Sequence, residues 1–177
     1  MDYDFTQKIL QLFSTFGKEI ELQKGDFLTR EGDVENKLYL IQSGAIRVYY
    51  LSDFEEQTVR LGYNGSIMNS LSSFISGKPS EFYIEAIRKT RLTSLTKDQL
   101  LTLIHENQSN LQMYVKLLET LITQQIDREI DLLISSPTER FNRVLKRSPT
   151  VFQHVPLKYI ASYLRMKPET LSRIRNS

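Results

Sequence analysis

Four polar residues near the C-terminus recur at the spacing of one helix face. They lie three and four positions apart, at Glu169, Ser172, Arg173 and Asn176. A period of 3.6 residues puts them on one stripe, opposite the apolar Leu171 and Ile174. Arg can donate two parallel hydrogen bonds to guanine, Glu can accept from the cytosine amine, and Ser can bond to several base edges. The stripe therefore predicts a helix that reads DNA bases through Glu169, Ser172 and Arg173. A polar stripe that only faces water is the alternative.

A second short helical pattern precedes this stripe, and the two together indicate a helix-turn-helix. We expect helices over residues 157–164 and 168–176, preceded by one over 138–146. Pro168 fits the first helical position, where its missing N–H is not needed. The apolar positions by which the two short helices would pack on each other are Ile160, Ala161, Leu164, Met166, Leu171 and Ile174.

The C-terminal segment is basic, although the net charge of the whole chain is only +2. Residues 137–177 hold nine Lys and Arg against two acidic residues, whereas residues 1–136 hold 14 against 19. A basic segment on an acidic body is typical of a nucleic-acid-binding module, although a solvated basic surface is the alternative. The basic residues that lie off the polar stripe, and that we expect to bind DNA phosphates, are Lys158, Arg165, Lys167 and Arg175.

Residues 109–135 carry a helical pattern without Gly or Pro. Apolar residues fall alternately four and three positions apart, as in a coiled-coil seam that weakens toward its C-terminal end. A helix of this length spans about 40 Å, more than a small β domain covers. We expect Ser109 as its N-cap and Pro137 as the start of the next unit. The seam predicts a parallel homodimer, with one helix buried in a monomer core as the alternative; the expected interface residues are Leu111, Val115, Leu118 and Ile122.

Between residues 19 and 96 the pattern changes to that of short β-strands. Runs of β-branched and aromatic residues alternate with Gly and Asn turns, which is typical of an antiparallel sandwich or roll. A short amphipathic helix is expected before them, over residues 4–16. The sequence thus predicts an α+β chain with an N-terminal jelly-roll-like β-roll, a long helix and a helix-turn-helix. The expected strands cover residues 37–42, 46–51, 58–63, 83–88 and 91–95.

The order of these parts and several local motifs resemble the Crp/Fnr family of transcription regulators over nearly the whole chain. In the DNA-reading element the resemblance is carried by VPLKYIASYL at 155–164 and PETLSRIR at 168–175, in the version found in Bacteroidetes. In the roll it is carried by GDFL at 25–28, Gly32, LYLI at 38–41, Ser43-Gly44 and Val48.

The resemblance implies three parts. They are a cyclic-nucleotide-binding-type roll over residues 1–108, a dimerisation helix over 109–136 and a DNA-binding domain over 137–177. It also implies that the chain is a homodimer on a palindromic operator, with DNA as its partner and RNA polymerase as a further candidate.

The chain departs from the family's helix-turn-helix at two positions. Arg165 stands in the turn, where the family has Gly, and a left-handed conformation there costs a non-Gly residue about 1–2 kcal/mol. Lys167 stands where the family has a Ser or Thr N-cap, and its ammonium cannot accept the capping hydrogen bond. Neither change removes a base-reading residue. Because the chain ends at Ser177, we expect this winged-helix-like unit to lack its β-wing.

Family members that bind cyclic nucleotides hold them with a phosphate-binding cassette, in which a Glu binds the ribose and an Arg binds the phosphate. The matching stretches here contain Asn69-Ser70 and Ser80-Glu81. Ser70 replaces the acid, Ser80 replaces the Arg, and Glu81 puts a negative charge beside the phosphate position. We therefore expect no cyclic AMP binding. Another small-molecule effector and a purely structural roll both stay open.

The composition also excludes several functions. The chain has no Cys, which excludes disulfides, thiol chemistry and iron–sulfur clusters and fits a reducing cytoplasm. His105 and His154 are too few to build a cupin-type metal site, so we expect neither a cofactor nor an enzyme. No apolar run could cross a membrane, and the acidic start lacks the features of a secretory signal. A regulatory module that acts on a protein partner is the alternative to a DNA-binding regulator.

Overall fold

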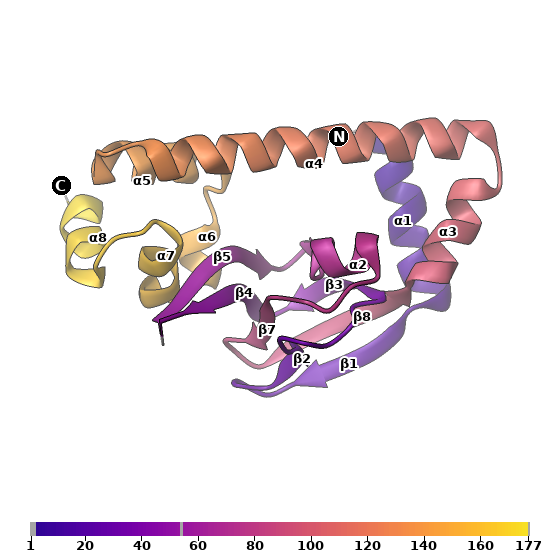
Figure 1. Ribbon diagram of the computed structural model, residues 1–177, viewed down its shortest axis with the longest axis horizontal. Coiled ribbons are helices and arrows are strands. Elements are labelled where there is room, and N and C mark those ends of the chain that lie inside the picture. Colours follow the sequence, from indigo (N-terminus) through magenta and orange to yellow (C-terminus); the bar gives the residue numbers. More distant parts are fainter. Residues whose placement is uncertain (1–2, 54, 177) are drawn as a thin grey trace.

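The computed structural model describes residues 3–53 and 55–176. The long helix α4 runs along one side of a β-roll, and shorter helices fill the space between them at both ends (Figure 1). The N-terminal helix and the helix before α4 stand at one end, and the last helices gather at the other. The helices are α1 (Tyr3–Phe16), α2 (Leu71–Ser76), α3 (Lys97–His105), α4 (Gln108–Leu133), α5 (Pro137–Arg147), α6 (Val151–His154), α7 (Leu157–Tyr163) and α8 (Pro168–Arg175).

The roll consists of two four-stranded antiparallel sheets, with strand orders β1-β8-β3-β6 and β2-β7-β4-β5. The predicted α+β class is confirmed, and each of the five strands expected from the sequence is present within three residues of its expected bounds. The strands are β1 (Lys18–Leu22), β2 (Phe27–Thr29), β3 (Lys37–Ser43), β4 (Ala45–Ser52), β5 (Glu55–Tyr63), β6 (Ile67–Met68), β7 (Tyr83–Ala86) and β8 (Thr90–Thr96).

Strand β4 is covered on both faces, unlike an ordinary strand at a protein surface. Ile46 and Val48 point into the roll, where they pack with Ile84 and Leu92. Ala45, one position out of phase, belongs to the core of the C-terminal helices. Because side chains alternate between the two faces of a strand, one strand serves both cores.

Helix α4 begins earlier than its sequence pattern suggests. The side chain of Asn107, and not that of Ser109, caps it by accepting a hydrogen bond from Asn110 N at 2.9 Å. The buried Asn110 side chain donates in turn to Leu103 O at 2.8 Å, which ties α4 to the end of α3. The expected N-cap at Ser109 is therefore wrong by two residues. Asn and Ser are comparable caps, and the tertiary bonds of Asn110 select the earlier one.

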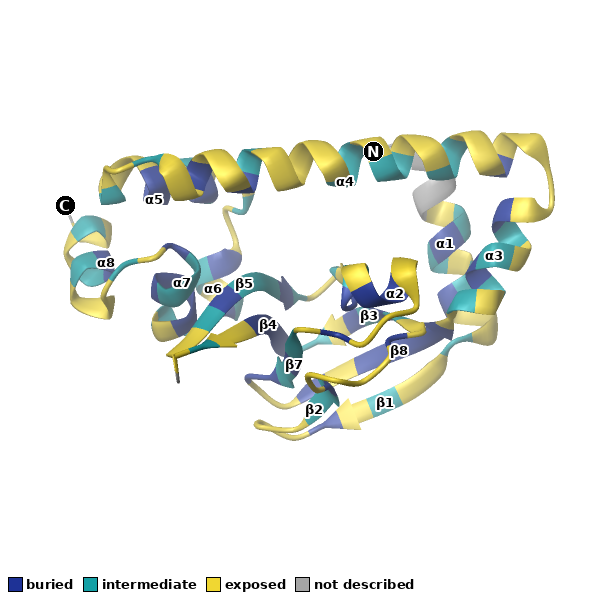
Figure 2. Cartoon of the chain, in the orientation of Figure 1, coloured by how far each residue is buried: buried dark blue, intermediate teal, exposed yellow. Residues whose placement is uncertain are grey.

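The four C-terminal helices share a core with the roll. Ser136 caps α5 by accepting from Glu139 N, and Pro137 occupies its first turn, as the sequence predicts. Helix α6 is absent from the sequence-based expectation. The core of this unit contains Phe141, Val144, Val151, Val155, Tyr159, Ile160, Ala161, Leu164 and Leu171 together with Ala45 and Ile87 of the roll. In Figure 2 these helices show buried residues toward the roll, whereas the outer side of α4 is mostly exposed.

Candidate nucleic-acid interface

Helices α7 and α8 form a compact pair around a tight turn. Ile160, Ala161, Leu164 and Leu171 are fully buried between them, and the other two predicted apolar positions are partly buried in the same cluster. Arg165 adopts a left-handed conformation with φ of 54°, as expected for its place in the turn. Met166 N donates to Ala161 O at 3.0 Å, the six-to-one bond of a Schellman motif.

The predicted base-reading residues lie on the outer face of α8. Glu169 and Arg173 are exposed, Ser172 is half-buried, and Leu171 on the opposite face is fully buried. Lys167 precedes the helix without a side-chain capping bond, as expected from its ammonium group. The structure thus places the polar stripe on an exposed helix face whose opposite side packs into a buried core.

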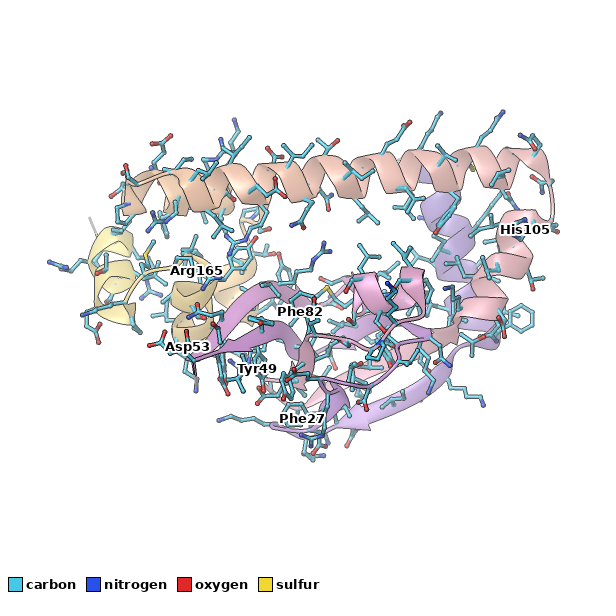
Figure 3. All side chains as sticks on the ribbon, viewed as in Figure 1. Phe27, Tyr49, Asp53, Phe82, His105 and Arg165 are labelled. Atoms are coloured by element: carbon cyan, nitrogen blue, oxygen red, sulfur yellow. The ribbon has the colours of Figure 1, made fainter. Side chains whose placement is uncertain are left out.

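The four predicted phosphate contacts are all exposed, but they differ in their local partners. Lys158 Nζ lies 4.6 Å from the centre of the Tyr159 ring, and Lys167 and Arg175 flank α8. Arg165 donates a hydrogen bond to Gln57 Oε1 of β5, so its guanidinium lies against the β4–β5 hairpin (Figure 3).

The Arg140 side chain stabilises the turn between α7 and α8, a role that was not predicted from the sequence. Its buried guanidinium donates to Leu164 O at 2.9 Å and to Arg165 O at 3.3 Å. It also donates to Ser135 O at 3.2 Å, near the end of α4. A positive charge at the C-terminal end of a helix satisfies carbonyls that lack intrahelical partners. The sequence could have indicated that Arg140 is buried, because it lies on the same helix face as the apolar Val144.

Two further arginines join α5 to α4 instead of facing outward. The carboxylate of Asp131, on α4, is fully buried and accepts from Arg143 Nε at 2.7 Å and from the guanidinium of Arg147. Burial alone raises the pKa of Asp131, but the hydrogen bonds from Arg147 and Arg143 outweigh it and hold that pKa below its usual range. The basic excess of residues 137–177 is therefore partly used inside the protein, and fewer charges are left for a partner.

Helix α7 lies on the β4–β5 hairpin of its own chain. Ser162 Oγ accepts from Thr58 N at 3.1 Å and donates to Glu56 O at 3.3 Å, as a strand neighbour would. The rings of Tyr63 and His154 stack at 5.0 Å. His154 is half-buried against Tyr63.

The outer face of α4 carries a continuous apolar stripe. Leu111, Val115 and Ile122 are between 36% and 60% exposed, and Leu118 is half-buried because it also lines the space toward the roll. The stripe runs one residue beyond the predicted seam positions Gln125 and Glu129, which are polar. It continues along the helix in steps of four and three through Ile126, Ile130 and Leu133. A monomer rarely leaves so long a stripe uncovered.

The degenerate cassette is closed by its own side chains. Ser70 Oγ and Ser80 Oγ form a hydrogen bond of 2.7 Å, and both residues are buried. Ser80 Oγ also contacts the backbone of Phe82. Glu81 is exposed, and Asn69 is buried beside the serine pair. The two serines therefore satisfy each other at the place where the resemblance puts the phosphate.

The fold and these sites define a cyclic-nucleotide-binding-type roll that carries a C-terminal helix-turn-helix. Residues 19–107 match the family described as the cyclic nucleotide-binding domain, and the chain belongs to that family. No curated protein sequence shows significant similarity to it. In the described part of the chain no helix is long and apolar enough to cross a membrane, and no group of three His, Asp or Glu side chains could hold a metal ion.

Three solved structures show how far the fold is shared. FixK2 from Bradyrhizobium japonicum has a TM-score of 0.75 and 19% identity, over 90% of this chain and 83% of that one. The catabolite activator protein of Thermus thermophilus has a TM-score of 0.58 and 21% identity, over 96% of this chain and 81% of that one. The c-di-GMP-responsive global regulator CLP of Xanthomonas campestris has a TM-score of 0.67 and 14% identity, over 96% of this chain and 90% of that one.

This chain therefore has the fold of Crp/Fnr-type transcription regulators, which confirms the resemblance seen in its sequence.

Proposed function

We propose that the chain is a sequence-specific DNA-binding transcription regulator that binds a palindromic operator as a homodimer. The observation that carries the proposal is the exposed face of α8, where Glu169 and Arg173 stand on a helix whose opposite face is fully buried. Exposed basic side chains of α7 and α8 flank this face. Such an arrangement suits a helix in the major groove, with phosphate contacts on either side.

Base-reading and phosphate-binding residues should respond differently to mutation. Arg173→Ala is expected to weaken operator binding by about 1–3 kcal/mol per half-site and to relax the preference at one base pair. Lys158→Ala is expected to weaken binding to all sequences alike and to reduce the salt dependence by about one unit. Selection from a random DNA library with each variant separates the two. If the Arg173→Ala protein keeps the wild-type preference at every position, Arg173 does not read a base.

The apolar stripe of α4 supports the homodimer. Two such helices in parallel would cover the exposed side chains of Leu111, Val115 and Ile122 on both copies. They would also place two recognition helices about 34 Å apart, which corresponds to half-sites about 10 bp apart. Ile122→Arg is expected to give a monomer in light scattering, because it brings like charges together across the stripe. Gln124→Arg, at an exposed position on the side of α4 opposite the stripe, is the matched control and should stay dimeric.

A further inference from the structure

Three consecutive backbone carbonyls at the end of α7 accept hydrogen bonds from side chains. The carbonyls just before them, of residues 160–162, accept from the backbone N–H groups of Leu164, Met166 and Arg165 and so close the turn. The next three, of residues 163–165, accept from two arginines on other helices. The last carbonyls of a helix need partners from outside it, and a positive charge is favourable there.

The two arginines come from α4 and α5. Arg128 of α4 donates to Tyr163 O, and its Cζ lies 3.8 Å from the centre of the Tyr163 ring. Arg140 of α5 donates from Nε to Leu164 O at 2.9 Å and from Nη2 to Arg165 O at 3.3 Å. The end of α7 is therefore bonded to both of the helices that precede the helix-turn-helix.

The guanidinium of Arg140 also bonds to the segment that follows α4. Its Nη1 donates to Ile134 O and to Ser135 O, the latter at 3.2 Å. Residues 134–136 form the non-helical link between α4 and α5. Because a guanidinium is planar and its N–H groups point in fixed directions, one side chain holds this link and the turn at a fixed separation. We call Arg128 and Arg140 the arginine clamp.

The arginine clamp is unfavourable to bury for stability alone. Both side chains belong to residues that are only 9% exposed, and over residues 3–53 and 55–176 neither forms an ion pair with a carboxylate. Arg128 Nη1 is buried and has no hydrogen-bond partner among the described residues. Removing a charge from water costs free energy that hydrogen bonds to carbonyls recover only in part. A smaller neutral donor could serve one carbonyl, but only Arg has enough donors to join two segments.

We propose that the arginine clamp positions α8 relative to α4 and thereby determines which half-site spacing the protein accepts in its operator. Pro168, the first residue of α8, follows Arg165 by only three residues, so a short stretch of chain separates the clamped turn from the reading face. Both arginines are buried and act through the turn, so they are positioning residues and not contacts to DNA. This inference rests on the proposed function.

Half-site spacing depends on the angle between α4 and α8. In a homodimer formed through α4, a fixed angle fixes the distance between the two copies of α8. One inserted base pair moves a half-site by about 3.4 Å along the DNA and turns it by about 35°. A dimer with a fixed angle cannot follow this change without strain, whereas a dimer with a loose joint can. Loss of the clamp should therefore weaken discrimination between spacings and leave the base preference within a half-site.

Gel shifts with the full chain test this on palindromes whose half-sites lie about 8 to 12 bp apart. The wild type should favour one spacing over its neighbours by about tenfold, which corresponds to about 1.4 kcal/mol. Arg140→Met should reduce this ratio to about threefold or less. Val144→Ala is the matched control, because Val144 is buried on the same helix and in the same core but makes none of the clamp's hydrogen bonds. It should keep the wild-type ratio even where it lowers stability.

A second measurement does not depend on DNA. The chain has no Cys, so Thr123→Cys on α4 and Arg175→Cys on α8, both at exposed positions, carry spin labels at two sites alone. An excess of unlabelled chain limits the measured distance to one chain. Pulsed electron paramagnetic resonance should give a narrow distance distribution without further change and with Val144→Ala, and a broader one with Arg140→Met. Arg128→Met should broaden it too, which keeps the inference testable if Arg140→Met does not fold.

Two results would overturn the inference. One is a wild-type spacing ratio in the clamp variants, and the other is an equal width of the distance distribution in the clamp variants and in Val144→Ala. If the wild type binds no DNA, the proposed function fails, and the spin-label distances still decide whether the clamp positions α8. If the wild type binds its operator but all variants share one spacing preference, the proposed function stands and only this inference fails.

Discussion

The packing of α5 against α4 depends on the buried carboxylate of Asp131. The substitution Asp131→Asn tests how much this carboxylate stabilises the protein. Asp131 accepts charge-assisted hydrogen bonds from Arg143 and Arg147. Each such bond contributes about 1.5–3 kcal/mol, and leaving the arginines without their anion adds to the loss. Both guanidinium groups are about one-third exposed, so water recovers part of that energy. We expect Asp131→Asn to lower the free energy of unfolding by about 2–4 kcal/mol.

Urea denaturation followed by circular dichroism measures this difference. Asp127→Asn is the matched control, because Asp127 lies 3.7 Å from Arg143 Nη2 and its side chain is 43% exposed. An exposed pair of this kind is worth about 0.5 kcal/mol or less. If Asp131→Asn is no more destabilising than Asp127→Asn, the assigned role of Asp131 is wrong.

The pH dependence gives a second check on Asp131. Its pKa in the folded protein lies below the ordinary value of 3.8, so its contribution is complete above that value. The contribution disappears as the pH falls through the lowered folded pKa, because the protonated carboxyl no longer pairs with the arginines. The stability difference between wild type and Asp131→Asn should therefore be constant from pH 7 to about 5 and shrink below about pH 4. A difference that stays constant down to pH 2 would contradict the pairing.

Three other predictions follow from single contacts. Ser162→Ala should destabilise the chain by about 1–3 kcal/mol, because it leaves the N–H of the buried Thr58 without a partner, and unchanged urea unfolding would argue against this contact. Gly44→Ala should be more destabilising than Gly65→Ala by about 1–3 kcal/mol, since both glycines have positive φ but only at Gly44 would a Cβ meet Lys89 O, at 2.3 Å; equal melting temperatures would refute it. Calorimetry should detect no cyclic AMP binding with a Kd of about 10 μM or tighter, because the serine pair closes the cassette.

Local patterns in the sequence determined most of the secondary structure and the identity of the helix-turn-helix. Pro168 starts α8 in the structure as expected, and Arg165 has the left-handed conformation expected for its place in the turn. The expected strands of the roll are present because alternation and turn residues act over a few positions. The same patterns identified the exposed faces of α4 and α8, since a period of 3.6 separates polar from apolar sides.

The partners of individual side chains were decided only by the tertiary structure. Arg140 and Lys158 contribute the same charge to the C-terminal segment, yet Arg140 is buried against Leu164 O whereas Lys158 is exposed. The ends of the Ser162–Thr58 hydrogen bond are 104 residues apart, and those of the Arg60–Gln125 bond are 65 apart. A local pattern indicates which face of an element is buried, but not which residue meets it there. That is settled only when distant segments pack together, because hydrogen bonds and ion pairs depend on distances of a few ångströms.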